Sequence, residues 1–271
     1  MPELPEVETT RRGIAPALEG NVISKVIVRE RRLRWPVPAG IEAELRDQPV
    51  KSLTRRAKYL LLENANGTAM LHLGMSGSMR IVSQDEPPEK HDHIDLIVAT
   101  GDVIRFNDPR RFGSFLWAGK DPHDHPLLNY LGPEPLAEDF SGEYLWQTAR
   151  KRQIAIKQHI MNGKVVVGVG NIYASEALFR AGIHPRRAAG KVSPQRMTKL
   201  ASAIREVLEE AIRQGGTTLR DYRGGDGKPG YFRQKLQVYE RDNKDCRLCG
   251  KPIKRIVQGQ RATYYCGHCQ R

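Results

Sequence analysis

The 271-residue sequence has no apolar stretch that approaches the length needed to span a membrane. It has no lipidation signal at either end, and its first residues are charged and lack the apolar core of a signal peptide. We therefore expect a cytoplasmic protein with no membrane partner. Internal repeats and low-complexity segments are absent too, so the length favours a globular chain divided between two domains.

Cysteine is scarce, and none occurs before residue 246. The cysteines form two pairs with two residues between the members of each, a spacing typical of a zinc ribbon. Two disulfides are the alternative, which a reducing compartment disfavours. The intervening residues predict a hairpin of Ile253–Gln258 and Arg261–Tyr265 that turns near Gly259. We predict one structural zinc ion, with the ligands Cys246, Cys249, Cys266 and Cys269.

Acidic residues are outnumbered: 31 Asp and Glu stand against 44 Lys and Arg, a formal net charge of +13. The basic residues are spread along the chain, which favours a polyanionic partner, with nucleic acid first. An anionic membrane surface is the alternative, and the missing membrane signals disfavour it. In the ribbon, basic side chains surround the negative four-thiolate centre, so its outer surface can face phosphates. They are Lys251, Lys254, Arg255 and Arg261.

From about residue 21 to 118, short segments rich in β-formers are separated by Gly, Asn and Asp. This pattern predicts a β-sandwich or barrel. The expected strands are Val22–Val28, Tyr59–Leu62, Ala69–Leu73, Met79–Val82, Ile94–Val98, Val103–Phe106 and Ser114–Trp117.

After the break at Gly132–Pro135 the periodicity becomes helical. The glycine-rich turn Val167–Asn171 delivers Asn171 and backbone amides to a helix start, where phosphate binds well. An ordinary connection between helices is equally compatible, because the turn lacks the lysine and the serine or threonine of a nucleotide-binding loop. The expected helices are Tyr144–Met161, Ile172–Ala181 and Pro194–Gln214.

The start of the chain predicts a reactive amine. A small second residue lets a methionine aminopeptidase expose Pro2 as a free secondary amine, and apolar residues at helical spacing from Leu4 to Leu18 place it at a helix start. The positive end of the helix dipole opposes protonation of that amine. A secondary amine that attacks a sugar carbon yields an iminium ion, the intermediate of lyase chemistry. The alternative is a proline that only begins a helix.

Two loops suit a nucleic-acid duplex. Met75 lies between glycines in the turn 73–77, where burial is poor, and predicts an apolar wedge between base steps. In the loop 108–113, Phe112 is an aromatic wedge beside Arg110, whose guanidinium suits the unpaired base. Each loop taken alone fits a capped hairpin better than a DNA contact, but the two loops together with the net charge favour DNA. A glycine-rich segment, 215–231, is expected to close over an extruded base, with a passive connector as the alternative.

These motifs together resemble the bacterial formamidopyrimidine-DNA glycosylases, which are also called 8-oxoguanine DNA glycosylases. The resemblance runs nearly from end to end and rests on the start MPELPEVET, segments 56–60, 72–77, 108–113 and 168–176, and the ribbon. It implies an α+β fold: a helix and two-layer β-sandwich in residues 1–132, a helix-two-turn-helix domain in 133–235 and a zinc ribbon in 236–271. It also implies a bifunctional base-excision repair enzyme that removes oxidised purines from damaged double-stranded DNA and cleaves the abasic strand by β,δ-elimination. A monomer is expected, because one bent duplex requires no symmetry.

The resemblance also implies roles for single residues. Pro2 would attack the deoxyribose C1′ and form a Schiff base, and Glu3 would donate the proton that opens the sugar ring, since burial disfavours a charged carboxyl group. Glu6, one helical turn on, would support the amine and its neighbours. Lys58 resembles the family's β-elimination residue and Arg261 its δ-elimination residue. Arginine is a poor proton donor, so we interpret Arg261 as a phosphate clamp.

Four further positions match residues that hold DNA phosphates or the opposite cytosine in the family: His91, Arg110, Arg152 and Asn171. Two positions depart from the family pattern. Asn162 stands where relatives often carry aspartate, and Arg220 where lysine is frequent. Both concern the grip on the flipped base and not the proposed chemistry.

Two other functions stay open at this point. The first is that of endonuclease VIII, a sister enzyme for oxidised pyrimidines with the same terminal proline and ribbon. Its relatives lack the loop Pro109–Gly113 in this form, which disfavours it. The second is a zinc-ribbon DNA-binding protein without enzymatic activity, in which Pro2 only starts a helix.

Overall fold

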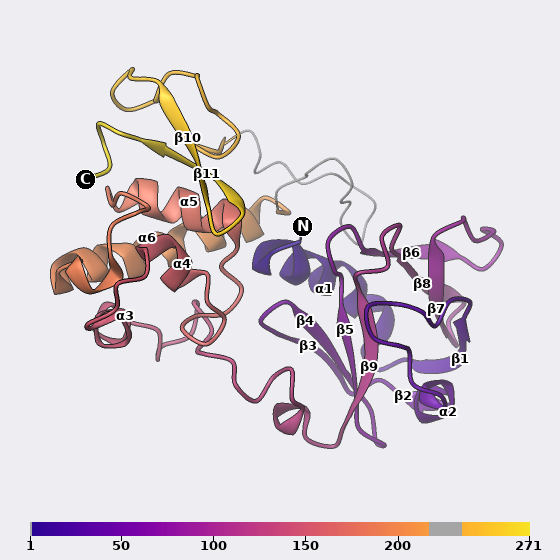
Figure 1. Ribbon diagram of the computed structural model, residues 1–271. Coiled ribbons are helices and arrows are strands. Elements are labelled where there is room, and N and C mark those ends of the chain that lie inside the picture. Colours follow the sequence, from indigo (N-terminus) through magenta and orange to yellow (C-terminus); the bar gives the residue numbers. More distant parts are fainter. Residues whose placement is uncertain (1, 217–234) are drawn as a thin grey trace. The chain divides into compact units, whose positions relative to one another are not determined.

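The computed structural model describes residues 2–216 and 235–271 (Figure 1). They form two compact units, one of residues 2–129 and 214–216 and the other of residues 130–213 and 235–271. The predicted α+β class is confirmed, because antiparallel sheets occupy the first unit and helices with a small hairpin the second. Most of the predicted loop 215–231, and Arg220 with it, lies outside the described residues. The separation of a ribbon domain at residue 236 stays a prediction.

The first unit contains two antiparallel sheets, with strand orders β2-β1-β7-β8-β6 and β3-β4-β5-β9. Every strand predicted in this region is present within a residue or two of its expected ends. Two strands and a short helix were missed. The elements are α1 (Leu4–Leu18), β1 (Val22–Val28), α2 (Ile41–Leu45), β2 (Gln48–Pro49), β3 (Ser52–Arg56), β4 (Tyr59–Glu63), β5 (Thr68–His72), β6 (Ser78–Ser83), β7 (Asp92–Val98), β8 (Asp102–Asn107), β9 (Ser114–Gly119) and the 3-10 turn η1 (Pro122–Asp124).

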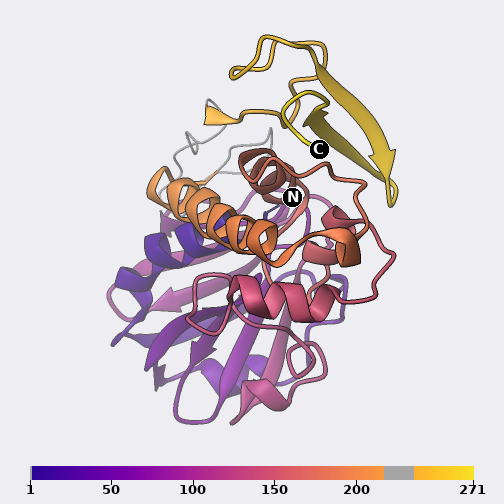
Figure 2. The same cartoon turned by 90° about the vertical axis from the view of Figure 1, so that its left-hand side faces the viewer.

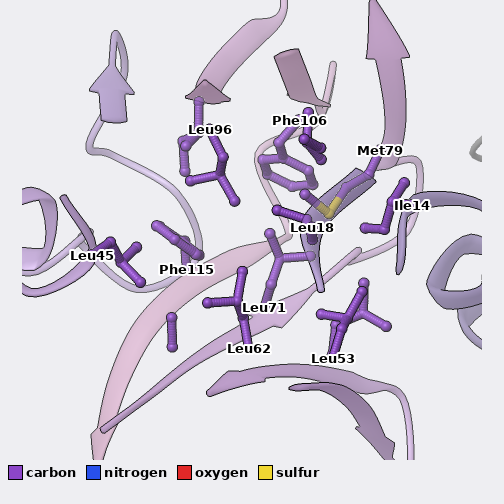
Figure 3. Close-up of a cluster of buried hydrophobic side chains, with 14 of the residues drawn as sticks. Ile14, Leu18, Leu45, Leu53, Leu62, Leu71, Met79, Leu96, Phe106 and Phe115 are labelled. Atoms are coloured by element: carbon purple, nitrogen blue, oxygen red, sulfur yellow. The ribbon is translucent and has the colours of Figure 1, made fainter. Parts of the chain in front are cut away.

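One hydrophobic core fills the space between the two sheets. Leu62 and Leu71 point into it from the four-stranded sheet, and Leu96 and Phe106 from the five-stranded sheet (Figure 3). All four side chains are at most 5% exposed. The inward side chains of both sheets therefore form a two-layer sandwich, one of the two architectures that the strand pattern predicts and the one that the family resemblance implies.

Helix α1 packs its apolar face against this core. Val7, Ile14 and Leu18 are buried in the same cluster as the strand residues, and α1 contacts β3, β4, β6 and β8. Beside this face lies the buried Glu8, whose carboxylate binds Arg11 at 2.9 Å, Arg12 at 2.8 Å and Arg55 of β3 at 3.2 Å. The apolar packing and the ion pair between Glu8 and Arg55 fix α1 to the sandwich.

The second unit is helical, and here one prediction was wrong. The single helix expected over 144–161 is two helices, α3 (Gly142–Ala149) and α4 (Ile156–Ile160). Lys151 between them has a φ of 60°, which no right-handed helix allows. The Arg152 carbonyl accepts from Gly190 N–H and the Ile156 N–H donates to the Arg187 carbonyl, so the backbone pairs with a distant segment.

The other helices and strands of this unit agree with the sequence prediction, and a 3-10 turn was not predicted. These elements are α5 (Asn171–Arg180), the 3-10 turn η2 (Ala189–Lys191), α6 (Pro194–Arg213), β10 (Ile253–Gln258) and β11 (Arg261–Cys266). Helix α3 packs closely on α6, since a Cβ on Gly142 would lie 2.4 Å from Thr198 Cα. Within the residues that the structure describes, no helix has the length and apolar character to cross a bilayer.

The hairpin β10–β11 packs on α5 (Figure 2, yellow). Phe179 of α5 lies in one buried cluster with Val238, Ile253 and Tyr264. Glu176, 1% exposed, accepts backbone N–H bonds of 2.8 to 2.9 Å from residues 237, 238 and 239. Burial raises the pKa of Glu176, although these bonds and Arg180 favour its charged form. The chain that leads into the ribbon is thereby tied to α5.

We expect Glu8→Gln to lower the free energy of unfolding by about 1.5–3 kcal/mol at pH 7, the usual range for lost hydrogen bonds to a charged group. Burial opposes the ionisation of Glu8, but hydrogen bonds from Arg11 and Arg12 outweigh it, and the pKa of Glu8 lies below its ordinary value of 4.5. A lowered carboxyl pKa stabilises the folded state above the unfolded pKa, and this stabilisation is lost as pH falls through the folded pKa.

Urea unfolding of both proteins at a series of pH values from 7 downwards measures this difference in the free energy of unfolding. The deficit of Glu8→Gln should shrink below pH 4.5, the ordinary value for this group. Glu209→Gln is the control, because its side chain is 53% exposed and 3.9 Å from Arg213, a kind of pair that contributes about 0–1 kcal/mol. A deficit that stays constant with pH would contradict the role of the Glu8 charge.

Candidate functional site

Pro2 directly precedes the N-terminus of α1, as predicted. Glu3 is the N-cap of the helix, and its backbone N–H donates to Glu6 Oε2 at 2.8 Å. Both carboxyl groups are 2% exposed. Gly216 lies against Glu6, because a Cβ there would be 3.1 Å from Glu6 Oε1. Glu6 therefore braces the backbone beside Pro2, while the N-terminal end of the helix dipole faces that residue.

Lys58 lies in the tight turn between β3 and β4, where Ala57 has a φ of 55°. The next residue, Tyr59, pairs with His72 of β5, and their ring centroids are 4.8 Å apart. Burial, then the positive charges of Lys58 and Arg34, lowers the pKa of His72 to about 4. His72 is therefore neutral near pH 7, and its Nδ1 accepts from Gly74 N–H at 2.9 Å. Sequence reasoning assigned His72 no role; its position between Lys58 and the Met75 turn depends on strand pairing.

The two predicted wedge loops touch through their backbones. Gly74 has a φ of +67°, and a Cβ there would lie 2.4 Å from Gly113 N. Met75 is 39% exposed and Phe112 41% exposed, although both are large apolar residues. Arg110 lies over the Phe112 ring, with its Cζ 4.8 Å from the centroid. The two loops are in backbone contact, and together they expose two apolar side chains and one guanidinium group.

His91 precedes β7, and its carbonyl accepts from Asp108 N–H at 3.0 Å. Its ring centroid is 6.3 Å from that of His93. The first unit therefore carries the predicted residues Pro2, Glu3, Glu6, Lys58, Met75, His91, Arg110 and Phe112. The second unit carries Arg152, Asn171, Arg261 and the four cysteines.

Asn171 begins α5, as predicted, and its side chain is engaged. Its Oδ1 accepts from Lys157 Nζ at 2.6 Å and its Nδ2 donates to the Ala262 carbonyl at 2.9 Å. Lys157, 2% exposed, also donates to Thr263 Oγ1 at 2.8 Å. Asn171 and Lys157 thus join α5 and α4 to β11. Sequence reasoning missed Lys157, because nothing in its local pattern distinguishes a buried lysine.

Arg261 is exposed at the tip of the ribbon hairpin, where it pairs with Gln258 across the turn of Gly259 and Gln260. Both turn residues have positive φ, 55° and 59°, which matches the predicted turn near Gly259. The position leaves the guanidinium in solvent, as a phosphate clamp requires.

Arg152 lines a cavity of about 600 Å³ between α3 and the segment 162–165. Lys151, Lys164 and Asn162 line it too. Burial, then the charge of Arg152, lowers the pKa of His159, which also lines the cavity. Asn162 is bound locally, with its Oδ1 accepting from Lys164 N–H at 3.0 Å. Three basic residues suit this cavity to an anion.

The four cysteines meet in one cluster. Their sulfur atoms lie within 4.8 Å of one another, with Cys246 Sγ 3.9 Å from Cys269 Sγ and Cys249 Sγ 3.5 Å from Cys266 Sγ. A tetrahedral zinc ion with Zn–S bonds of about 2.3 Å needs sulfur separations of about 3.8 Å. The cysteines are free thiols, so the predicted zinc site is confirmed and the disulfide alternative is wrong.

Comparison with known proteins identifies a family that has a zinc finger at the position of the four-cysteine cluster. Three family profiles match: the formamidopyrimidine-DNA glycosylase N-terminal domain over residues 1–115, the H2TH domain of the same glycosylases over 131–223, and the zinc finger found in FPG and IleRS over 244–271. The chain belongs to the formamidopyrimidine-DNA glycosylase family. The predicted resemblance is confirmed.

Individual relatives of this glycosylase family cover the whole chain. The formamidopyrimidine-DNA glycosylase of Thioalkalivibrio sulfidiphilus is 58% identical over 100% of both chains, and that of Photobacterium profundum is 54% identical over 100% of both. The structure of the MutM (Fpg) protein of Thermus thermophilus has a TM-score of 0.89 and 37% identity over 99% of this chain and 98% of its own. A Lactococcus lactis Fpg mutant in complex with Fapy-dG-containing DNA has a TM-score of 0.91 and 32% identity over 99% of both chains.

We expect Cys249→Ser to lose stoichiometric zinc, because a serine hydroxyl does not supply the fourth thiolate. Tight duplex binding should fall with it, since the ribbon carries Arg261. Zinc content by atomic emission and affinity by fluorescence anisotropy measure both. His268→Ala is the control: this exposed residue lies between two ligands and leaves all four thiolates in place. Full zinc content in Cys249→Ser would contradict the four-thiolate site.

We expect Gly74→Ala to destabilise the first unit more than Gly20→Ala. Both glycines have left-handed φ values, +67° and +78°, so both substitutions carry a strain of about 1–2 kcal/mol. Only at Gly74 would the new Cβ meet backbone, Gly113 N at 2.4 Å, whereas nothing lies within 4 Å at Gly20. Urea unfolding compares the two. Equal losses would show that the loops can separate at no cost.

Proposed function

We propose that this chain is a base-excision repair enzyme that removes oxidised purines, 8-oxoguanine and formamidopyrimidines, from duplex DNA and then cleaves the abasic strand. Of the functions open from the sequence, this one has the support of the family, whose profiles and relatives cover the chain. Solved relatives are complexes with Fapy-dG-containing and abasic-site-containing DNA. The formal charge of +13 is suited to that polyanionic partner.

The observation that carries the mechanism is Pro2 at the N-terminus of α1, followed within one helical turn by two buried glutamates, Glu3 and Glu6. After removal of Met1, the Pro2 amine attacks C1′ of the damaged nucleotide, the bond from C1′ to the base breaks, and the proton lost by the amine nitrogen leaves with the base. Glu3 supplies the proton that lets the ring oxygen leave C1′, which gives the iminium ion. The neutral state of the amine is favoured by the helix dipole.

The cationic iminium then activates the sugar for two eliminations, which expel the 3′ and the 5′ phosphate in turn. Lys58 is the residue of the first of these, the β-elimination. It lies in the β3–β4 turn, in the same unit as Pro2. Arg261 holds a departing phosphate through its charged guanidinium, which donates bidentate bonds. The four thiolates would hold a structural zinc ion that fixes the hairpin carrying Arg261, and the steps above use the Pro2 amine and the side chains of Glu3, Lys58 and Arg261 alone.

Phosphate contacts from His91, Arg152 and Asn171 would position the duplex, and Met75 with Phe112 and Arg110 would enter the base stack. Asn171 would contribute through the start of α5, since its side chain binds Lys157 and Ala262. We propose a monomer that works in the cytoplasm on nucleoid DNA, without a membrane partner.

Pro2→Gly, or a chain that retains Met1, should lower lyase turnover by orders of magnitude, because the terminal imino group is lost. Borohydride trapping on abasic DNA, followed by peptide mapping, locates the linked residue. Pro5→Ala is the control, since it changes the other proline of the same helix start and keeps the terminal imino group. An adduct on a lysine instead of Pro2 would overturn the mechanism. Excision of 8-oxoguanine against thymine glycol tests the substrate class.

A further inference from the structure

One buried carboxyl group connects the loops of the first unit that carry the proposed DNA contacts. Asp108 is 0% exposed. Its Oδ1 accepts from Ser76 Oγ at 3.0 Å, beside Met75, and from Arg110 N–H at 3.3 Å. Its Oδ2 accepts from Gly113 N–H at 2.7 Å, beside Phe112. The two oxygens therefore hold the Met75 turn and both ends of the Arg110–Phe112 segment.

The backbone of Asp108 reaches a third segment. Its N–H donates to the His91 carbonyl at 3.0 Å, and its carbonyl oxygen is 2.9 Å from His93 Nε2. The same carbonyl accepts from Arg111 N–H at 3.2 Å, which closes the turn. Residues 76, 91, 93, 110 and 113 thus meet at one side chain and its peptide groups, although they come from separate parts of the sequence.

The spacing of the two wedge loops depends on this junction. Gly74 leaves no room for a side chain against Gly113, so the loops are in backbone contact. Met75 and Phe112 nevertheless remain 39% and 41% exposed. A wedge made of two side chains from two loops works only if both reach the same base step, and a rigid support removes the entropy that ordering them on DNA would otherwise cost.

We propose that Asp108, with Ser76 as its partner, is a positioning residue for base extrusion. It holds Met75, Arg110 and Phe112 at a constant spacing before DNA binds, so that they enter the duplex together. This inference rests on the proposed function of these three side chains and adds a group that does not itself touch DNA. It predicts a defect in extrusion and not in the chemistry at Pro2.

The variants are Asp108→Asn, which replaces one acceptor oxygen with a donor, and Ser76→Ala, which removes a single bond and keeps the carboxylate. Asp102→Asn is the control: it makes the same change at an exposed position of β8. Each variant is measured in single-turnover excision of 8-oxoguanine, in borohydride trapping on a preformed abasic site, and by fluorescence of 2-aminopurine placed beside the lesion.

Asp108→Asn should slow excision and the fluorescence change roughly tenfold, the effect of one lost hydrogen bond to a charged group. Ser76→Ala should slow them less, in the same direction. Trapping on the abasic site should stay close to that of Asp102→Asn for both. This split between substrates is not expected of a residue that only stabilises the fold.

Equal losses on damaged and abasic DNA, or unchanged extrusion in both variants, would overturn the proposal. Should Asp108→Asn fold poorly, as thermal unfolding would reveal, Ser76→Ala decides alone. If the unaltered chain formed no adduct, the proposed chemistry at Pro2 would fail, and the fluorescence change would still decide the role of Asp108.

Discussion

The burial of one face of α1 in the core between the two sheets is the constraint on which the rest of the first unit depends. Ile14 and Leu18 are fully buried among side chains of both sheets, and the buried Glu8 of the same helix binds Arg55 of β3. A helix fixed in this way has one position for its first residue. The reactive amine proposed at Pro2 is therefore placed by apolar packing that begins at Val7, five residues further along the chain, although no core residue takes part in the chemistry.

In the second unit, polar contacts and the four-thiolate zinc site position the residues proposed to contact DNA. A ribbon of this size has too little apolar area for a core of its own, and its few buried side chains share a cluster with Phe179 of α5. Glu176 binds three consecutive backbone N–H groups, and Lys157 bridges Asn171 and Thr263. Four thiolates around zinc complete the support. Arg261 is exposed at the hairpin tip, and its position depends on the Glu176 bonds, on the Lys157 bridge and on the four-thiolate zinc site.

The failed helix prediction shows where sequence patterns mislead. Leu145, Ala149, Ile156 and Ile160 are all buried and keep one helical phase, so the pattern predicts a continuous helix across the break. The chain leaves the helix because residues 152 and 156 bond to residues 190 and 187. Strand β3 was missed for the related reason that only Leu53 of its five residues is buried. Its assignment depends on pairing with β4.

The sequence by itself determined the strands of the sandwich other than β2 and β3, helices α1, α5 and α6, the ribbon hairpin, the four zinc ligands and the family, because these depend on local spacing and on motifs within a few residues. It also singled out the residues proposed to meet DNA. Only the tertiary structure decided that Lys58 lies beside a neutral His72, that the Asn171 side chain binds the ribbon, and that Asp108 joins three loops. Each of these joins residues 14 or more positions apart, such as Ser76 with Asp108 (32) and Asn171 with Ala262 (91). Contacts at such separations are formed by the packing of sheets and helices, which leaves no periodic signal in either partner.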